Sequence, residues 1–202
     1  MHLIKNMIKK IFTISLLILS IINPVLTKEV NPLSIGSKEA KITVKVFSSL
    51  TCPHCTTFHN KIFENLKEDY IDTGEVKFEH HAFPLDLAAL NAEKVVRCAP
   101  NLSEKFQLLA KIYDKQKKWA VGSDINKIND ILVKIGTESK MSEDNLRACL
   151  KNEKTQELIL NERIKAQKEY NITSTPTIYI NNKKYEDKHE FKSFKRQIDK
   201  LL

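Results

Sequence analysis

The stretch ITVKVFSSLTCPHC, residues 42–55, joins a β-branched run to two cysteines that are separated by two residues. The run at residues 42–47 has the composition and length of a β-strand. Pro53 suits the first turn of a helix, because the N–H group that proline lacks has no partner there. The stretch therefore predicts a strand that leads into a helix, with Cys52 at the helix N-terminus and Cys55 one turn further along.

The residues that follow extend this stretch to a strand–helix–strand unit. Apolar residues recur at every fourth position after the cysteines, which predicts a helix; they are Phe58, Ile62, Leu66 and Tyr70. Apolar and polar residues then alternate over residues 76–82, which predicts a half-buried strand. Two strands joined in this way form a βαβ unit with a right-handed crossover. We expect residues 28–40 to form a short extended lead-in to this unit.

The rest of the chain predicts a helical block and a second strand–strand–helix unit. Residues 85–151 contain no convincing strand, and we expect four helices there, over 85–99, over 103–119, around 125–135 and after an N-cap at Ser142. A long helix at 155–170, a strand at 177–180, a tight turn at Asn181-Asn182 and a last helix complete the order. The predicted class is α/β.

The N-terminus predicts export. A basic start that contains Lys5, Lys9 and Lys10 precedes an uncharged apolar run at residues 11–27. This is the layout of a secretory signal peptide, which we place at residues 1–27. An uncleaved membrane anchor is the alternative, because the run lies at the lower edge of the length that spans a bilayer. Either arrangement puts the remaining chain in an oxidising compartment, where disulfides persist.

Length and charge limit the number of domains and the class of partner. The chain has 202 residues, which suits one compact domain at residues 28–202. Its formal net charge is +8, but the lysines are spread among acidic residues. Because no dense basic run with interleaved aromatic residues is present, we expect no nucleic-acid partner.

A CxxC pair can bind zinc, form an inert staple or exchange electrons. A structural zinc site needs four ligands, but the sequence has no second CxxC pair and no spaced pair of histidines. His59 lies one turn along the helix from Cys55, and a histidine at such a position is more often a surface residue. His80 and His81 point to opposite faces of a strand. A disulfide that closes so short a loop removes little entropy from the unfolded chain. We therefore expect redox chemistry with no metal or other cofactor.

The neighbours of the two sulfurs assign their roles. Free N–H groups and the helix dipole stabilise a thiolate on Cys52, and His54 adds a donor or a positive charge in the first turn that Pro53 opens. Cys52 is the exposed sulfur that is attacked, and the shielded Cys55 resolves the mixed disulfide. Stabilising the thiolate stabilises the dithiol form, so the disulfide is predicted to oxidise other proteins.

The remaining two cysteines, Cys98 and Cys149, are predicted to form a disulfide between the first and fourth helices of the block. An even number of cysteines in an exported chain favours such pairing. The bond would close a loop of about 50 residues and stabilise the fold by roughly 4 kcal/mol on the entropic model. A second redox relay is the alternative, although the CxxC spacing is missing.

These motifs together resemble those of the DsbA-like thiol:disulfide oxidoreductases of the thioredoxin superfamily. The resemblance covers nearly everything from about residue 40 onward and rests on CPHC at 52–55, FPLD at 83–86 and Thr175-Pro176 before a strand. It implies a thioredoxin-like fold with a helical insertion, about residues 85–151, between the βαβ and ββα halves. It also implies that Pro176 is cis, and that Thr175 and Pro176 face the active-site cysteines and bind extended substrate.

The resemblance implies an enzyme that introduces disulfide bonds into secreted or envelope proteins through Cys52 and Cys55. The expected partners are these reduced proteins and a DsbB-like membrane protein that re-oxidises the pair, and we expect a periplasmic monomer. A disulfide isomerase or reductase is a second hypothesis. A non-catalytic chaperone or adaptor is a third, although it would not need both cysteines. Many relatives carry a buried acid where this chain has Val46, so the proton route to Cys55 stays open.

Overall fold

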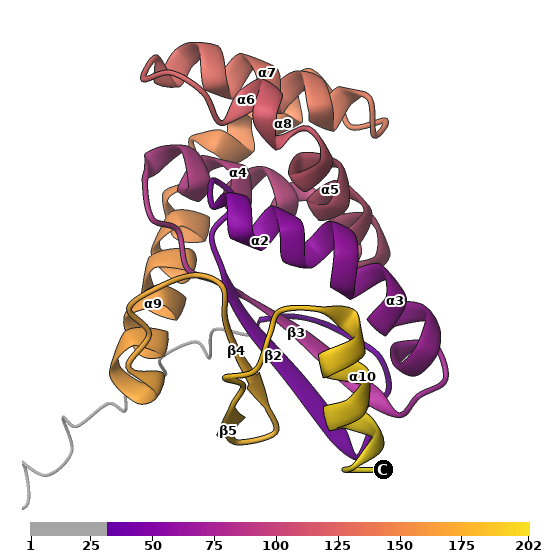
Figure 1. The fold of residues 1–202 in the computed structure, drawn as a ribbon. Helices are drawn as coiled ribbons and strands as arrows, with labels where there is room; N and C mark the ends of the chain where they lie inside the picture. Colours follow the sequence, from indigo (N-terminus) through magenta and orange to yellow (C-terminus); the bar gives the residue numbers. More distant parts are fainter. Residues whose placement is uncertain (1–31) are drawn as a thin grey trace, which may run out of the picture.

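The β-branched run before the cysteines forms β2 (Ile42–Ser48), the middle strand of a five-stranded sheet with the order β1-β3-β2-β4-β5 (Figure 1). The computed structural model describes residues 32–202, so the signal peptide expected at residues 1–27 lies outside the described residues. β2 pairs in parallel with β3 (Val76–Ala82) and antiparallel with β4 (Thr177–Ile180). The parallel pair confirms the predicted βαβ unit.

Two short strands form the edges of the sheet. The segment expected to be a plain lead-in contains β1 (Leu33–Ile35), which pairs antiparallel with β3. Gly36 ends this strand with φ +103°, and a Cβ there would lie 2.5 Å from the carbonyl oxygen of Val76. At the other edge, Asn181 has a φ of 54° and leads into β5 (Lys183–Lys184), as the expected tight turn requires.

The crossover between β2 and β3 is helical but is wider than a regular α-helix in two places. Its segments are α2 (Pro53–Phe58), η1 (His59–Phe63), α3 (Glu64–Leu66) and η2 (Lys67–Ile71). One turn of an α-helix takes about 3.6 residues, so a strict four-residue apolar row drifts around its axis. The π-helical turns of η1 and η2 are wider and reduce this drift. All four apolar residues of the row are buried.

Five helices follow β3 and form the insertion, at the end of the sheet where α2 begins (Figure 1). They are α4 (Leu87–Cys98), α5 (Leu102–Asp114), α6 (Gln116–Trp119), α7 (Ile125–Thr137) and α8 (Glu143–Leu150). Side chains at the N-caps define four of these starts; they belong to Asp86, Asn101, Asp124 and Ser142. The single helix expected over 103–119 is wrong, because the chain turns at Lys115 and starts α6 as a separate element.

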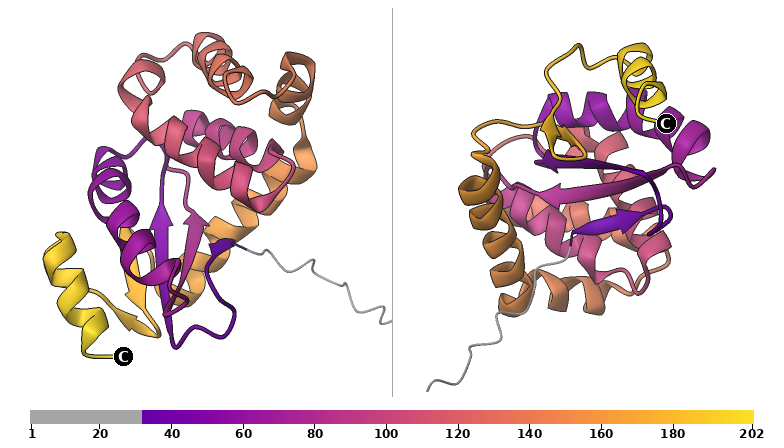
Figure 2. Two further views of the ribbon diagram at one scale, coloured as in Figure 1. Left: turned by 90° about the vertical axis from the view of Figure 1, so that its right-hand side faces the viewer. Right: turned by 90° about the horizontal axis from the view of Figure 1, so that it is seen from below.

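Helices cover both faces of the sheet. The crossover and α10 (Phe191–Asp199) lie on one face, whereas α9 (Glu153–Tyr170) lies on the other (Figure 2). The main hydrophobic core lies on the first face and joins Val46 of β2 to Phe58 of α2 and Phe194 of α10. Within residues 32–202, none of the helices has the length and apolar content that crossing a membrane requires.

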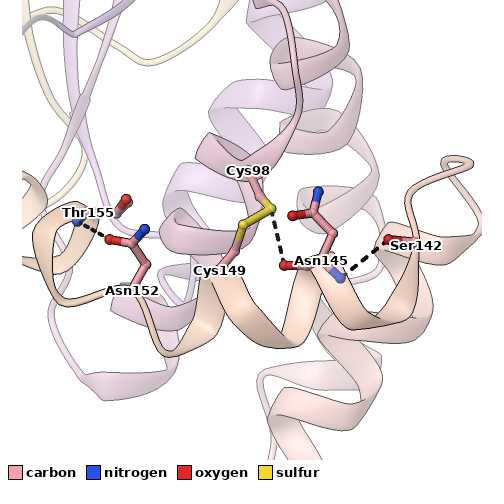
Figure 3. Close-up of a disulfide and its surroundings, with 6 residues drawn as sticks. All are labelled: Cys98, Ser142, Asn145, Cys149, Asn152 and Thr155. Atoms are coloured by element: carbon pink, nitrogen blue, oxygen red, sulfur yellow. Dashed lines mark hydrogen bonds between the residues drawn. A yellow bond between two sulfur atoms is a disulfide. The ribbon is translucent and has the colours of Figure 1, made fainter.

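A disulfide between Cys98 and Cys149 ties α4 to α8 across a sequence separation of 51 residues (Figure 3). The two Cα atoms are 6.0 Å apart. The bond lies between two helix starts whose N-caps hold backbone N–H groups: Ser142 accepts from Asn145, and Asn152 accepts from Thr155 (Figure 3). It therefore joins the first helix of the insertion to the last.

Removal of this disulfide should destabilise the fold. We expect the double variant Cys98→Ser/Cys149→Ser to lose roughly 4 kcal/mol in its free energy of unfolding, because the unfolded chain regains the entropy of a loop of about 50 residues. Urea unfolding of both proteins, with Cys52 and Cys55 reduced in each, measures the difference. A loss below about 1 kcal/mol, or a shifted redox titration of the other two cysteines, would instead favour the redox relay.

Candidate active site

Cys52 is the N-cap residue of α2, and Cys55 lies one turn inside the helix. Cys52 has extended backbone angles, with φ −77° and ψ 121°, and its carbonyl oxygen accepts the N–H groups of Cys55 and Thr56 at 3.1 and 3.2 Å. Pro53 occupies the first helical position, as its missing N–H group favours. Both cysteines are free thiols.

The two thiols differ in accessibility, although neither is open to solvent. Cys52 is 8% exposed and Cys55 is 1% exposed. Cys52 is therefore less exposed than the sequence predicted. The reason is tertiary: the loop before β4 covers it, and the carbonyl oxygen of Thr175 lies 3.3 Å from Cys52 Sγ. The Thr175–Pro176 peptide bond in this loop is cis.

The contacts around Cys52 favour its thiolate and lower its pKa to about 5. The Cys55 thiol, which donates a hydrogen bond to the Cys52 sulfur, lowers the pKa most, and partial burial opposes it. Thr175 lowers the pKa further, and its hydroxyl is buried with no other hydrogen-bond partner. The backbone N–H groups of Cys55 and His54 also lower the pKa of Cys52. This arrangement holds a negative charge at the start of a helix.

Cys55 has the opposite environment. Burial raises the pKa of its thiol far above the ordinary value, and the hydrogen bond and charge of Cys52 raise it further. One sulfur is therefore held as a thiolate and the other as a thiol. Such a pair has one good leaving group and one protected partner.

His54 contributes to the lowered pKa of Cys52 through its backbone. Its side chain is exposed on the first turn of α2, and its contribution to the lowered pKa of Cys52 comes from its backbone N–H group. The sequence interpretation, in which the imidazole supplies a donor or a charge, stays a prediction. Any residue with an N–H group at this position makes the same contact.

Gln116 on α6 holds the loop that carries Cys52, and sequence reasoning missed it. Its side-chain amide donates to the carbonyl oxygens of Leu50 at 2.8 Å and Cys52 at 3.0 Å. The amide is buried, although lysines flank Gln116 in the sequence. One signal could have found it: Tyr113, Gln116 and Trp119 recur every third residue, and both aromatic residues are buried.

A chain of hydroxyl and carboxylate groups ties the same loop to α4. Ser49 Oγ and Thr51 Oγ1 are 3.1 Å apart, and Thr51 donates to Asp86 at 2.7 Å. Asp86 also accepts the N–H group of Ala89 at 2.7 Å and thereby caps α4. The sequence FPLD at 83–86 therefore connects the active-site loop to the insertion.

A groove of about 580 Å³ opens beside Cys52. Its walls are Thr51 to Pro53 on one side and the segments 85–88 and 120–128 of the insertion on the other. Two large apolar side chains at its rim are solvent-exposed, Leu85 by 50% and Leu87 by 54%. The accessible side of the reactive sulfur therefore faces an apolar hollow.

The histidines considered as zinc ligands are dispersed. His59 is buried and not at the surface as expected, because it lies one turn after the buried Cys55. His80 and His81 point to opposite faces of the sheet, where they contact Glu93 at 2.8 Å and Glu79 at 3.1 Å. Within residues 32–202, no group of three or more metal-binding side chains is placed to hold an ion.

Comparison with known proteins identifies relatives over most of the chain. A family model described as Thioredoxin matches residues 28–200. A protein named "Putative protein-disulfide oxidoreductase" from Rickettsia bellii (strain RML369-C) is 28% identical over 172 residues, which cover 85% of this chain and 65% of that protein. "Disulfide bond formation protein D" of Bacillus subtilis (strain 168) is 29% identical over 175 residues, which cover 83% and 76%. The chain thus spans less than two thirds of the rickettsial relative.

Solved structures show the same architecture. Wolbachia pipientis alpha-DsbA1 has a TM-score of 0.77 with 29% sequence identity, and the match covers 85% of this chain and 90% of that one. Oxidised BdbD from Bacillus subtilis has a TM-score of 0.71 with 26% identity, over 84% of this chain and 92% of that one.

The reduced protein should show a thiolate titration near pH 5, against about 8.5 for a free cysteine. The thiolate absorbance at 240 nm measures it, and Cys52→Ala should remove the transition. Cys55→Ala should raise the pKa, because it deletes the thiol that lowers the pKa most. Since the folded pKa is depressed, ionisation stabilises the folded reduced protein fully above about pH 8.5, and this contribution is lost as the pH falls to about 5. A transition near pH 8.5 would contradict the assigned contacts.

Replacement of Gln116 should loosen the active-site loop. We expect Gln116→Met to lower the free energy of unfolding by about 1–3 kcal/mol, because the carbonyl groups of Leu50 and Cys52 lose their buried donor. It should also change the alkylation rate of Cys52. The matched control Gln107→Met alters an exposed glutamine on α5 and should stay within about 0.5 kcal/mol of the parent. Equal effects of the two substitutions would contradict the anchoring role.

Proposed function

The chain belongs to the DsbA-like thiol:disulfide oxidoreductases of the thioredoxin superfamily, and from this premise we propose that it is an exported enzyme that introduces disulfide bonds into secreted or envelope proteins. The observation that carries the proposal is the asymmetry of its two thiols. Cys52 has a pKa lowered to about 5, whereas burial keeps Cys55 protonated. The names of two relatives, a disulfide bond formation protein and a protein-disulfide oxidoreductase, support the same chemistry.

The reaction is a pair of thiol–disulfide exchanges. A substrate thiolate attacks Cys52 Sγ of the Cys52–Cys55 disulfide, the bond between the two cysteines breaks, and Cys55 leaves and takes a proton. A second substrate thiolate then attacks the substrate sulfur of the mixed disulfide and releases Cys52 as a thiolate. The substrate loses two electrons, which reduce the cysteine pair, and its two thiol protons pass to Cys55 and to solvent.

The direction follows from the stability of the leaving group. Contacts that stabilise the Cys52 thiolate stabilise the reduced enzyme, so its disulfide has a strong tendency to accept electrons. Those contacts come from the backbone, from Cys55 and from Thr175, and they exist only in the folded protein. We therefore assign the oxidising direction and not the reducing one.

The surface around Cys52 suits an unfolded chain. The carbonyl oxygen of Thr175, the residue before the cis Pro176, lies against the sulfur, and the groove beside it presents exposed Leu85 and Leu87. A chain that has not yet folded exposes apolar side chains and extended backbone, and both are complementary to this site. We assign substrate binding to this loop and groove.

The proposal places the enzyme in the periplasm as a monomer and requires an electron acceptor. A DsbB-like membrane protein is the re-oxidant that completes the cycle. The predicted signal peptide and the family membership support this placement.

The function can be tested with reduced, unfolded ribonuclease as the substrate. The oxidised protein should form disulfides in it, Cys52→Ala should not, and the reduction potential should lie well above the roughly −270 mV of thioredoxin. Assays with scrambled ribonuclease and with insulin measure isomerase and reductase activity for comparison. Faster unscrambling or insulin reduction than oxidation would indicate an isomerase or a reductase. If the Cys52→Ala variant still protects the unfolded substrate, a chaperone is indicated.

A further inference from the structure

Four titratable side chains pack together behind Cys55, on the face of the sheet that α2 covers. They are His59 of η1, His80 of β3, Glu93 of α4 and Tyr113 of α5, and each is at most 5% exposed. Four separate elements therefore contribute one ionisable group each to a single buried position. The reaction steps described above do not use any of them.

The cluster begins one helical turn after Cys55. The backbone N–H group of His59 donates to the carbonyl oxygen of Cys55, so the two side chains are one turn apart on the same helix face. The His59 ring lies 4.8 Å from the Tyr113 ring, measured between centroids. His80 Nε2 lies 2.8 Å from Glu93 Oε1. On the sheet, His80 is also the in-register neighbour of Val46 in β2.

Tyr113 connects the two ends of the cluster. Burial raises the pKa of its phenol most, and the charges of Cys55 and Glu93 follow, so the hydroxyl lies within the field of both groups. Ser48 opposes this rise. A phenol can donate and accept a hydrogen bond at once, which is the property that a proton-transfer step between two groups requires.

Two atoms of the cluster have no hydrogen-bond partner in the described part of the chain. They are His59 Nε2 and Glu93 Oε2, and both are buried. An unpaired buried polar atom lowers stability, so these two atoms are candidates for a functional role. Burial and the charge of His80 lower the pKa of His59 to about 4, so its ring is neutral near pH 7 and can accept a proton.

Charged groups next to the cluster form a second network, on which Glu93 and His80 act electrostatically. Arg97 of α4 forms an ion pair with Glu162 of α9, which also accepts the N–H group of Ala82 and lies 3.7 Å from His81. Burial and then Arg97 act on the pKa of Glu162 more strongly than Glu93 does. This network lies on the side of the sheet that α9 covers, away from Cys55.

We propose that His59, Tyr113 and the Glu93–His80 pair exchange the proton of Cys55 during thiol–disulfide exchange. The inference rests on the function proposed above. Cys55 gains a proton each time it leaves as a thiolate and loses it each time it attacks, and its burial keeps bulk water away. The cluster supplies the proton in the first case and receives it in the second. These residues position and transfer a proton, whereas Cys52 and Cys55 form and break the covalent bonds.

Re-oxidation by oxidised glutathione isolates the step. The Cys52 thiolate attacks one sulfur of the glutathione disulfide, and one glutathione leaves as a thiolate. Cys55 then gives its proton to the cluster, attacks Cys52 Sγ and releases the second glutathione, while the proton passes on to solvent. Two electrons move from the cysteine pair to glutathione. Only the second exchange involves the proton of Cys55, so the first exchange is an internal control.

The test compares Glu93→Gln, His59→Gln and Tyr113→Phe with the parent protein. Reduced protein is mixed with oxidised glutathione, quenched in acid at successive times and analysed by mass spectrometry. We expect the first exchange to keep its rate and the second to fall by at least about tenfold, so that the Cys52–glutathione mixed disulfide accumulates. The pH dependence of the second exchange should also change. Tyr113→Phe keeps the packed ring and carries the test should Glu93→Gln fail to fold.

The matched control is Tyr70→Phe, which removes the hydroxyl of another buried tyrosine, one that donates to Asp199 at the far end of the crossover. It should leave both exchanges unchanged. The proton role would be overturned if the rate of the second exchange stayed within twofold of the parent in Tyr113→Phe and in every other variant that folds. An equal slowing of both exchanges would overturn it as well. A parent protein that forms no mixed disulfide at all would overturn the proposed function itself.

Discussion

The antiparallel pairing of β2 with β4 is the constraint on which the active site depends. It aligns Val44 with Ile180 and Phe47 with Thr177, and so brings the Thr175–Pro176 loop against the start of α2. A slip of one residue would turn every side chain of β4 to the opposite face of the sheet and move this loop along the sulfur. The low pKa of Cys52 is therefore a property of strand register as much as of the helix.

The helical insertion positions the site as well as enclosing it. Gln116 and Asp86 attach two of its segments to the loop that carries Cys52, and other parts of it form one wall of the groove. Glu93 on α4 and Tyr113 on α5 reach the opposite side of the cysteine pair. The insertion thus surrounds the start of α2 from the side of the groove and from the side of the core.

Local patterns predicted most of the fold, and long-range contacts account for what they missed. The βαβ unit, the N-terminal position of Cys52 on its helix and the helix capped by Ser142 follow from periodicity, proline and an N-cap residue near each other in sequence. Three features depend on partners far away in the sequence. The three-residue strand β1 exists because it pairs with β3. Gln116 binds carbonyl groups more than sixty positions earlier, and Thr175 covers Cys52. The burial of His59 was within reach, because Cys55 was already placed inward one turn before.

The disulfide between Cys98 and Cys149 must itself be formed while the chain matures. Its two cysteines lie 51 positions apart, on the first and last helices of the insertion, so the bond can form only after both helices have emerged and come together. Under the proposed function the newly exported chain is then a client of the reaction that it later performs. Under the same function, older copies can oxidise newer ones, and the supply of mature enzyme then depends on the enzyme already present.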